Sequence, residues 1–131
     1  MYYFYVAVFG GIGALSRYGL SLAIDAGGFP LNTLLINVTG CFFLAFVIRY
    51  VATFPKVSNA LVNGLGTGLI GAFTTFSTFS VETGLLLQRG ATGTAAFYVI
   101  LSMSAGFASA GLGLFVSHRL IGRRELERNG R

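Results

Sequence analysis

The chain has 131 residues, of which 54% are hydrophobic and only 10% are charged, and its formal net charge is +5. Because a soluble domain carries about a quarter charged residues, this composition excludes an ordinary soluble protein and indicates one all-α integral membrane domain. Four apolar stretches reach the ~20 residues needed to cross the hydrocarbon core. They are residues 2–24, 33–54, 60–87 and 94–118, followed by a basic tail at 119–131.

Basic residues gather on one side of the predicted topology. With four spans, the N-terminus, the connection between the second and third spans, and the C-terminal tail share a side, which holds seven of the nine Lys and Arg residues. The other side holds Arg89 alone, and Arg17 lies inside the first span. The positive-inside rule predicts cytoplasmic termini, and the tail is expected to contact anionic headgroups rather than nucleic acid. The seven residues are Arg49, Lys56, Arg119, Arg123, Arg124, Arg128 and Arg131.

The first span, 2–24, combines small residues with one cation. The segment GGIGA at 10–14 forms a face that lets another helix approach closely. Arg17 lies at membrane depth, where a cation costs about 2.5–3.5 kcal/mol on insertion scales. We expect it either to reach a headgroup by snorkelling, or to face a partner, a wet vestibule or a carboxylate.

The second span carries an amide about one turn inside the membrane. Pro30 and Asn32 suit a helix start, with Asn32 as the capping residue. Burying the Asn37 amide in lipid without a partner would cost about 2–7 kcal/mol, so it must face protein or water. It either forms an interhelical hydrogen bond or donates its NH₂ group to something that passes.

The third span contains the run TTFSTFS at 74–80, which has five hydroxyls, two phenylalanines and no charge. Four glycines precede it, and glycine weakens a helix by roughly 0.5–1 kcal/mol relative to alanine. The pattern predicts a break near the bilayer midplane, of the kind that lines a cavity or holds an ion. The alternative is a continuous helix whose hydroxyls bond to its own carbonyls.

Neutral hydrogen-bond donors and aromatic ring edges together are typical of a path that binds a small anion weakly. The anion needs hydrogen-bond donors after it leaves water, whereas a full positive charge would trap it. Phe76 and Phe79, at i and i+3, can turn their positive edges toward an anion. In the fourth span Tyr98 and Ser102 share one helical face, which is either a packing surface or the wall of such a path.

Enzyme and metal chemistry find little support in the sequence. The one histidine, His118, ends the last span without a cysteine or carboxylate at ligand spacing. A proton-coupled small-ion carrier needs a carboxylate in the membrane, and Glu82, near the end of the third span, is the only candidate. A structural hydrogen bond is the expected role of Glu82, and the carrier remains the alternative function.

Three segments resemble motifs of the Fluc, or CrcB, family of fluoride channels. They are GGIGALSRY at 10–18, NTLLINVTG at 32–40 and GAFTTFSTFSVE at 71–82. The resemblance covers all four spans, and the TTFSTFS run followed by glutamate is its most specific part. It implies four-helix subunits with a break in the third helix, assembled as an antiparallel dual-topology homodimer with two fluoride pores at the interface.

The resemblance also implies roles for individual residues. Phe76 and Phe79 would meet fluoride with their ring edges, and Asn37 would donate a hydrogen bond to the ion. Tyr98 and Ser102 would belong to a polar track along the fourth helix.

A structural sodium ion (Na⁺), which is not transported, is implied as well. Backbone carbonyls of Gly71 and Thr74 would hold it. The implied function is a passive, fluoride-selective channel in the cell membrane that exports cytoplasmic fluoride. The seven-to-one distribution of basic residues favours a single orientation. A heterodimer with an oppositely oriented partner is therefore the alternative to the homodimer.

Overall fold

A computed structural model describes residues 1–24 and 27–129, and within these ranges every regular element is a helix. Four helical segments of the described chain are long and apolar enough to cross a membrane, at Tyr2–Ala23, Leu31–Thr53, Asn59–Gln88 and Thr92–Glu127. The elements are α1 (Tyr2–Ala23), α2 (Leu31–Arg49), η1 (Val51–Thr53), α3 (Asn59–Asn63), η2 (Gly64–Ile70), α4 (Gly71–Phe73), α5 (Phe76–Gln88) and α6 (Thr92–Asn129).

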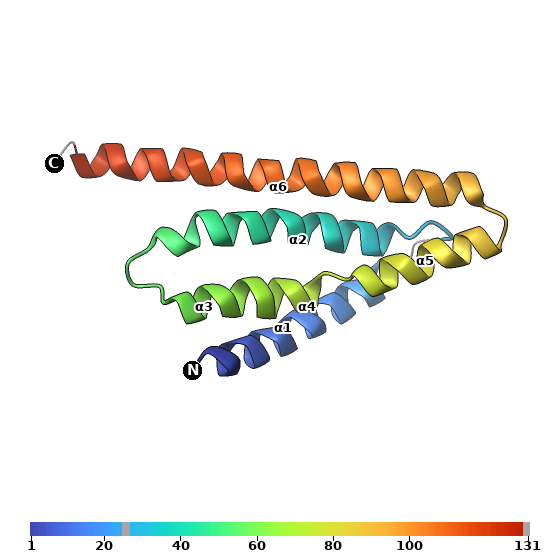
Figure 1. Cartoon of the computed structure of the whole chain (residues 1–131), viewed down its shortest axis with the longest axis horizontal. Coiled ribbons are helices and arrows are strands. Elements are labelled where there is room, and N and C mark those ends of the chain that lie inside the picture. The colour runs from blue at the N-terminus through green and yellow to red at the C-terminus, as the bar shows by residue number, and fades with distance from the viewer. Residues whose placement is uncertain (25–26, 130–131) are drawn as a thin grey trace.

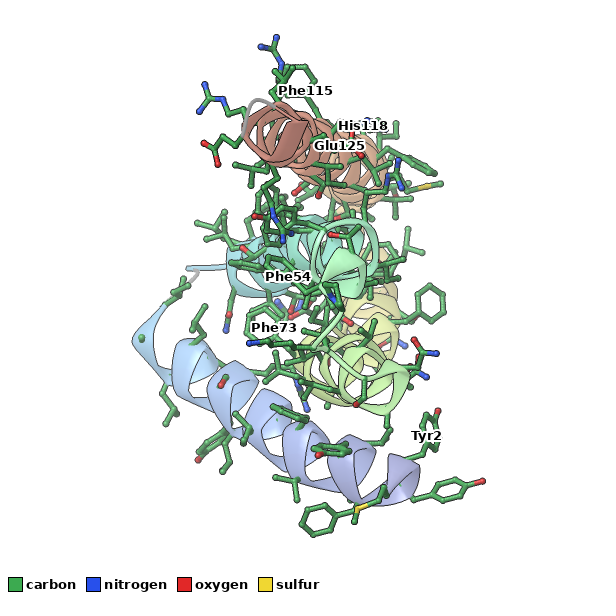
Figure 2. All side chains as sticks on the ribbon, turned by 90° about the vertical axis from the view of Figure 1, so that its left-hand side faces the viewer. Tyr2, Phe54, Phe73, Phe115, His118 and Glu125 are labelled. Atoms are coloured by element: carbon green, nitrogen blue, oxygen red, sulfur yellow. The ribbon has the colours of Figure 1, made fainter. Side chains whose placement is uncertain are left out.

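The spans lie side by side as an open layer. Helix α6 packs against α2, and α1 packs against η2 and α4. Figure 1 shows both termini and the connection from α2 to α3 at the same end of the molecule. In the end view of Figure 2, α1 and α6 form the two edges and the other spans lie between them. The chain therefore does not close into a bundle by itself.

Small residues bring α1 and η2 into close contact. A Cβ added at Gly13 would overlap the Leu69 carbonyl oxygen, and one added at Gly68 would lie 2.8 Å from the Val6 carbonyl oxygen. Neither position can therefore hold a larger residue at this backbone separation. The prediction that the first span presents a small face to another helix is confirmed at Gly13.

The contact between α2 and α6 uses small residues and hydroxyls. A Cβ at Gly113 would lie 2.6 Å from the Phe42 carbonyl oxygen, so the backbones approach closely here. Ser109 donates from Oγ to the Val38 carbonyl at 2.7 Å. Ser117 is fully buried and donates to the Gly113 carbonyl. This part of the polar face on α6 is a packing surface against α2.

Two details differ from the sequence-based predictions. Asn32 does not cap α2, because the helix begins at Leu31 with Pro30 before it, and the Asn32 amide instead donates to the Ser21 carbonyl of α1 at 3.4 Å. Helix α6 does not end near residue 118 but continues to Asn129, so the basic tail is its extension.

The extension is held to the rest of the chain at its basic side. The Arg124 guanidinium lies over the Phe54 ring, 4.0 Å from the centroid, a cation–π contact. Arg131 lies outside the described residues, as does the side chain of Arg128.

Candidate functional site: an interrupted third span

The third span is interrupted near its middle. Helix α4 ends at Phe73 and α5 begins at Phe76, while Thr74 (φ −76°, ψ 158°) and Thr75 (φ −147°, ψ 122°) have extended backbone. Figure 1 shows this step between α4 and α5. Thr75 then caps α5, because its Oγ1 accepts a hydrogen bond from the Thr78 N–H at 3.1 Å.

Asn37 of α2 supplies hydrogen bonds at the interruption. Its Nδ2 donates to the Thr75 carbonyl at 2.9 Å, and its Oδ1 accepts from the Thr75 N–H at 2.8 Å. The side-chain amide thus satisfies a backbone donor and a backbone acceptor that an uninterrupted helix would have satisfied itself. Since an amide NH₂ carries two hydrogens, one donor of Asn37 is left for a further acceptor.

Arg17 lies on the other side of the interruption. Its Nε donates to the Ala72 carbonyl at 3.3 Å. The carbonyls of a terminating helix lack intrahelical partners, and a cation near that end is favourable. Of the alternatives weighed for Arg17, the structure places it against a protein partner, and that partner is a backbone carbonyl of α4.

The hydroxyls of the TTFSTFS run bond within the chain. Thr74 donates to the Ile70 carbonyl at 2.9 Å, and Ser80 donates to the Phe76 carbonyl at 2.9 Å. Thr75 Oγ1 lies 2.9 Å from Thr78 Oγ1 and 3.2 Å from Ser77 Oγ. Every hydroxyl of the run therefore takes part in a hydrogen bond within the chain.

The two phenylalanines predicted to meet the anion lie together. The ring centroids of Phe76 and Phe79 are 5.9 Å apart. Phe76 is 80% exposed on the single chain, whereas Phe79 is half-buried, with its ring centroid 5.1 Å from that of Tyr98. The pair thus runs from the open face of the chain into its interior.

Tyr98 is fully buried and shares a carboxylate with α2. Its hydroxyl donates to Glu82 Oε2 at 2.9 Å, and Thr33 Oγ1 donates to Glu82 Oε1 at 2.8 Å. Glu82 therefore joins α5 to α2 and α6, which confirms the predicted structural hydrogen bond. The sequence did not single out Thr33 as a partner of Glu82, because a hydroxyl in the first turn of a helix is common and indicates no particular contact.

Ser102 is different from the other hydroxyls of α6. Its Oγ is buried and has no hydrogen-bond partner within the described chain. Leaving a buried hydroxyl unpaired costs about 1–3 kcal/mol, so a ligand that accepts from it would recover part of that free energy.

Backbone oxygens at the interruption have the chemistry of a site for a hard cation. The last carbonyls of α4 have no continuing helix to bond them, and Gly71 and Thr74 lie at that end. The described residues contain no cluster of three His, Cys, Asp or Glu side chains that could hold a metal ion. Carbonyl oxygens are ligands that hard cations accept, and the Gly71 carbonyl also accepts a hydrogen bond from Thr74 Oγ1 at 3.5 Å.

Comparison with known proteins identifies the family. The profile of the family described as CrcB-like protein, Camphor Resistance (CrcB), matches residues 4–114. This chain belongs to the CrcB-like family. The CrcB-like segment contains every residue of the interruption described above, and it stops before the basic extension of α6.

The similar proteins include several with the name fluoride-specific ion channel FluC. The FluC 2 protein of Listeria monocytogenes serovar 1/2a is 47% identical over 125 residues, which cover 95% of this chain and 97% of the relative. FluC 2 of Listeria innocua serovar 6a is 44% identical over 94% of this chain and 95% of the relative. FluC 1 of Bacillus anthracis is 46% identical over 85% of this chain and 83% of the relative.

Proposed function

We propose that this CrcB-like protein is a passive, fluoride-selective channel of the cell membrane that exports cytoplasmic fluoride. The observation that carries the proposal is that the Asn37 amide bonds the interrupted backbone at Thr75, directly before the Phe76–Phe79 ring pair. The names of relatives that are 44–47% identical support fluoride as the ion.

Weak and repeated contacts explain how such a site conducts. The free N–H of Asn37, the positive edges of the phenyl rings and the unpaired Ser102 hydroxyl each offer a partial positive charge. None of them carries a full charge, so the ion is bound well enough to leave water and weakly enough to move on. Arg17 donates from Nε to the Ala72 carbonyl beside the interruption.

The path is completed by a second chain in this proposal. A layer that leaves Phe76 80% exposed at the interruption offers half of an interface rather than a closed pore. An antiparallel homodimer would cover this ring and give two equivalent paths. A heterodimer with an oppositely oriented partner would do the same and would agree better with the asymmetric distribution of basic residues.

Structural sodium belongs to the same proposal. The Gly71 and Thr74 carbonyls would hold the ion, and two copies of the chain would double the number of oxygens. The ion would supply a fixed positive charge between the chains. Arg17 and Asn37 would keep the interrupted backbone in place around it, through Ala72 and Thr75.

Export requires no pump. Neutral hydrogen fluoride crosses the membrane from acidic surroundings and dissociates in the cytoplasm. An inside-negative potential then favours exit of the anion by about 2.3 kcal/mol per 100 mV. A channel that conducts fluoride in both directions is therefore sufficient to lower its cytoplasmic concentration.

A proton-coupled carrier that uses Glu82 is the second candidate. Its supporting observation is that Glu82 lies within the third span, whereas Glu125 and Glu127 lie in the basic C-terminal extension of α6. Both carboxylate oxygens accept hydrogen bonds from hydroxyl groups, and this tie to Thr33 and Tyr98 favours a fixed residue over an alternating one.

Liposome efflux separates the two candidates. Purified protein is reconstituted in vesicles loaded with potassium fluoride, and efflux is followed with a fluoride electrode after valinomycin releases the voltage. Rapid fluoride loss without chloride loss and without a pH gradient is the result expected of the channel. Efflux that begins only when a pH gradient is imposed would support the carrier and reject the channel.

A further inference from the structure

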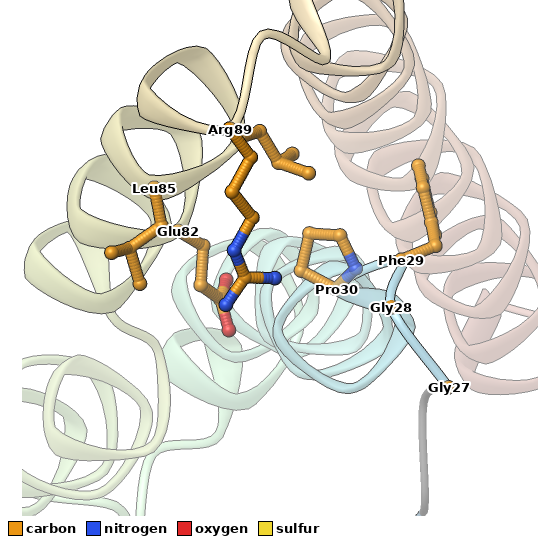
Figure 3. Close-up of a pocket in the computed structure, with 8 residues that line it drawn as sticks. Gly27, Gly28, Phe29, Pro30, Glu82, Leu85 and Arg89 are labelled. Carbon is orange, nitrogen blue, oxygen red and sulfur yellow. The ribbon is translucent and has the colours of Figure 1, made fainter.

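A pocket opens beside the last turn of α5, at the end of the molecule opposite to the termini. Its volume is about 220 Å³, and it lies between that turn and the connection from α1 to α2. Its charged lining residues are Glu82 and Arg89, which Figure 3 shows on its walls. The lining residues are Gly27, Gly28, Phe29, Pro30, Glu82, Leu85, Leu86 and Arg89.

The fold fixes the backbone of Arg89 at this pocket. Gly90 has φ +74°, a left-handed conformation that ends the helix. Its N–H donates to the Leu87 carbonyl, and the next N–H, of Ala91, donates to the Leu86 carbonyl, each at 3.0 Å. This is the Schellman pattern of a helix end. This helix end fixes the backbone of Arg89. Its exposed side chain lies seven residues, about two helical turns, after Glu82 and therefore on the same face of the helix.

Glu82 connects the pocket to the predicted path. Its carboxylate is held by the Tyr98 hydroxyl, and the Tyr98 ring lies 5.1 Å from the Phe79 ring, centroid to centroid. The direct donors to this carboxylate, Thr33 and Tyr98, are neutral hydroxyls. Figure 3 shows the Arg89 guanidinium pointing toward the Glu82 carboxylate.

We propose that this pocket is the water-filled mouth of the anion path and that Arg89 binds small anions there while it offsets the charge of Glu82. The inference rests on the proposed channel function. A carboxylate on the wall of an anion path repels the ion by a Coulomb interaction that water weakens without removing. Arg89 is the only Lys or Arg between Lys56 and Arg119, so its cation has no substitute from those stretches of the chain.

The position of Arg89 suits a site that must release its ion. Its side chain is exposed at the pocket, where water screens the guanidinium charge. Water also keeps the anion partly hydrated, so the attraction raises the local anion concentration without holding the ion tightly. A cation at the membrane midplane would trap the anion instead.

Fluoride efflux from liposomes at two ionic strengths tests the role of Arg89. We expect Arg89→Gln to lower efflux about tenfold at about 10 mM salt. At about 1 M of an impermeant salt, where the screening length is about 3 Å, the deficit should disappear. Arg89→Lys should retain efflux at both salt concentrations, because it keeps the charge. Lys56→Gln is the matched control, since it removes one exposed cation that does not line the pocket.

A charge-compensation test links Arg89 to Glu82. The double variant Glu82→Gln/Arg89→Gln should conduct better at low salt than Arg89→Gln alone, because it removes both the repulsion and its compensation. A deficit of Arg89→Gln that is equal at both salt concentrations would overturn the inference, as would a deficit shared with Arg89→Lys or Lys56→Gln. Should Glu82→Gln fail to fold, the salt series of the Arg89 variants decides alone.

The two proposals fail in different ways. Wild-type protein that releases fluoride, combined with an Arg89→Gln variant that matches it at low salt, would reject only the role of Arg89. Wild-type protein that releases no fluoride would reject the channel itself and the inference that rests on it.

Discussion

The third and fourth spans contain similar residues, yet only the third is interrupted. Both are rich in glycine and hydroxyl side chains, but α6 is one helix of 38 residues, whereas the third span steps out of helical geometry at Thr74 and Thr75. In α6 the hydroxyls add bonds to a complete backbone, as when Ser104 donates to the Ile100 carbonyl and Ser117 to the Gly113 carbonyl.

An external group explains the difference between the two spans. Asn37 offers Thr75 both a donor and an acceptor, so the backbone there loses little when it leaves the helix. No side chain of the described residues does the equivalent for the middle of α6. Hydroxyls and glycines make a helix easier to interrupt, but a matching amide from a neighbouring helix determines where it is interrupted.

The largest expected effect follows from removing that amide. Asn37→Ala leaves the Thr75 N–H and carbonyl without partners, at about 1–3 kcal/mol for each buried group. We expect a clear fall in the melting temperature in detergent and loss of fluoride efflux. Asn37→Asp keeps the acceptor for the Thr75 N–H but loses the donor to the Thr75 carbonyl. The stability of this variant should therefore lie between that of wild type and that of Asn37→Ala. Wild-type stability for Asn37→Ala would refute this account of the interruption.

Substitution of either ring should reduce conduction while the fold persists. Phe76→Ile and Phe79→Ile remove the aromatic edges but keep apolar volume, and we expect each to lower efflux about tenfold or more, equivalent to about 1.4 kcal/mol. Only Phe79→Ile should also destabilise the chain, because Phe79 packs on Tyr98 whereas Phe76 is 80% exposed. Chemical cross-linking in the same vesicles tests whether wild type and both variants form the proposed dimer. Wild-type flux through both variants would remove the rings from the path.

A smaller effect on conduction is expected at the carboxylate. Glu82→Gln retains one oxygen acceptor for Thr33 or Tyr98, so the channel should fold with a lower melting temperature and conduct within a few-fold of wild type at high salt. The measurement is fluoride efflux with and without a pH gradient. Selective loss of pH-driven exchange in this variant would instead identify Glu82 as the working group of a carrier.

The sequence predicted the class of fold better than the contacts within it. Hydropathy alone located the four spans, because about 20 apolar residues have few alternatives to a membrane helix. It also singled out Asn37, since an amide at that depth requires a partner. The partner itself, Thr75, could not be predicted, because the pairing depends on how α2 and the third span align. The pocket at Arg89 could not be predicted either, because it joins segments more than fifty residues apart.

The comparison of Ser102 with Ser109, two serines of α6, gives the smallest expected effect and the most specific one. Ser102→Ala removes a buried hydroxyl that has no partner in the described chain, so stability should stay unchanged or rise slightly, while fluoride efflux falls if the hydroxyl donates to the ion. Ser109→Ala removes a 2.7 Å bond to the Val38 carbonyl, so it should lower stability by about 1 kcal/mol and leave efflux near the wild-type value. Each variant removes one serine Oγ from α6, so a difference between their effects comes from the different surroundings of the two hydroxyls. Equal effects on stability and on efflux would show that the face of α6 is a packing surface throughout, and Ser102 would then have no place in the path.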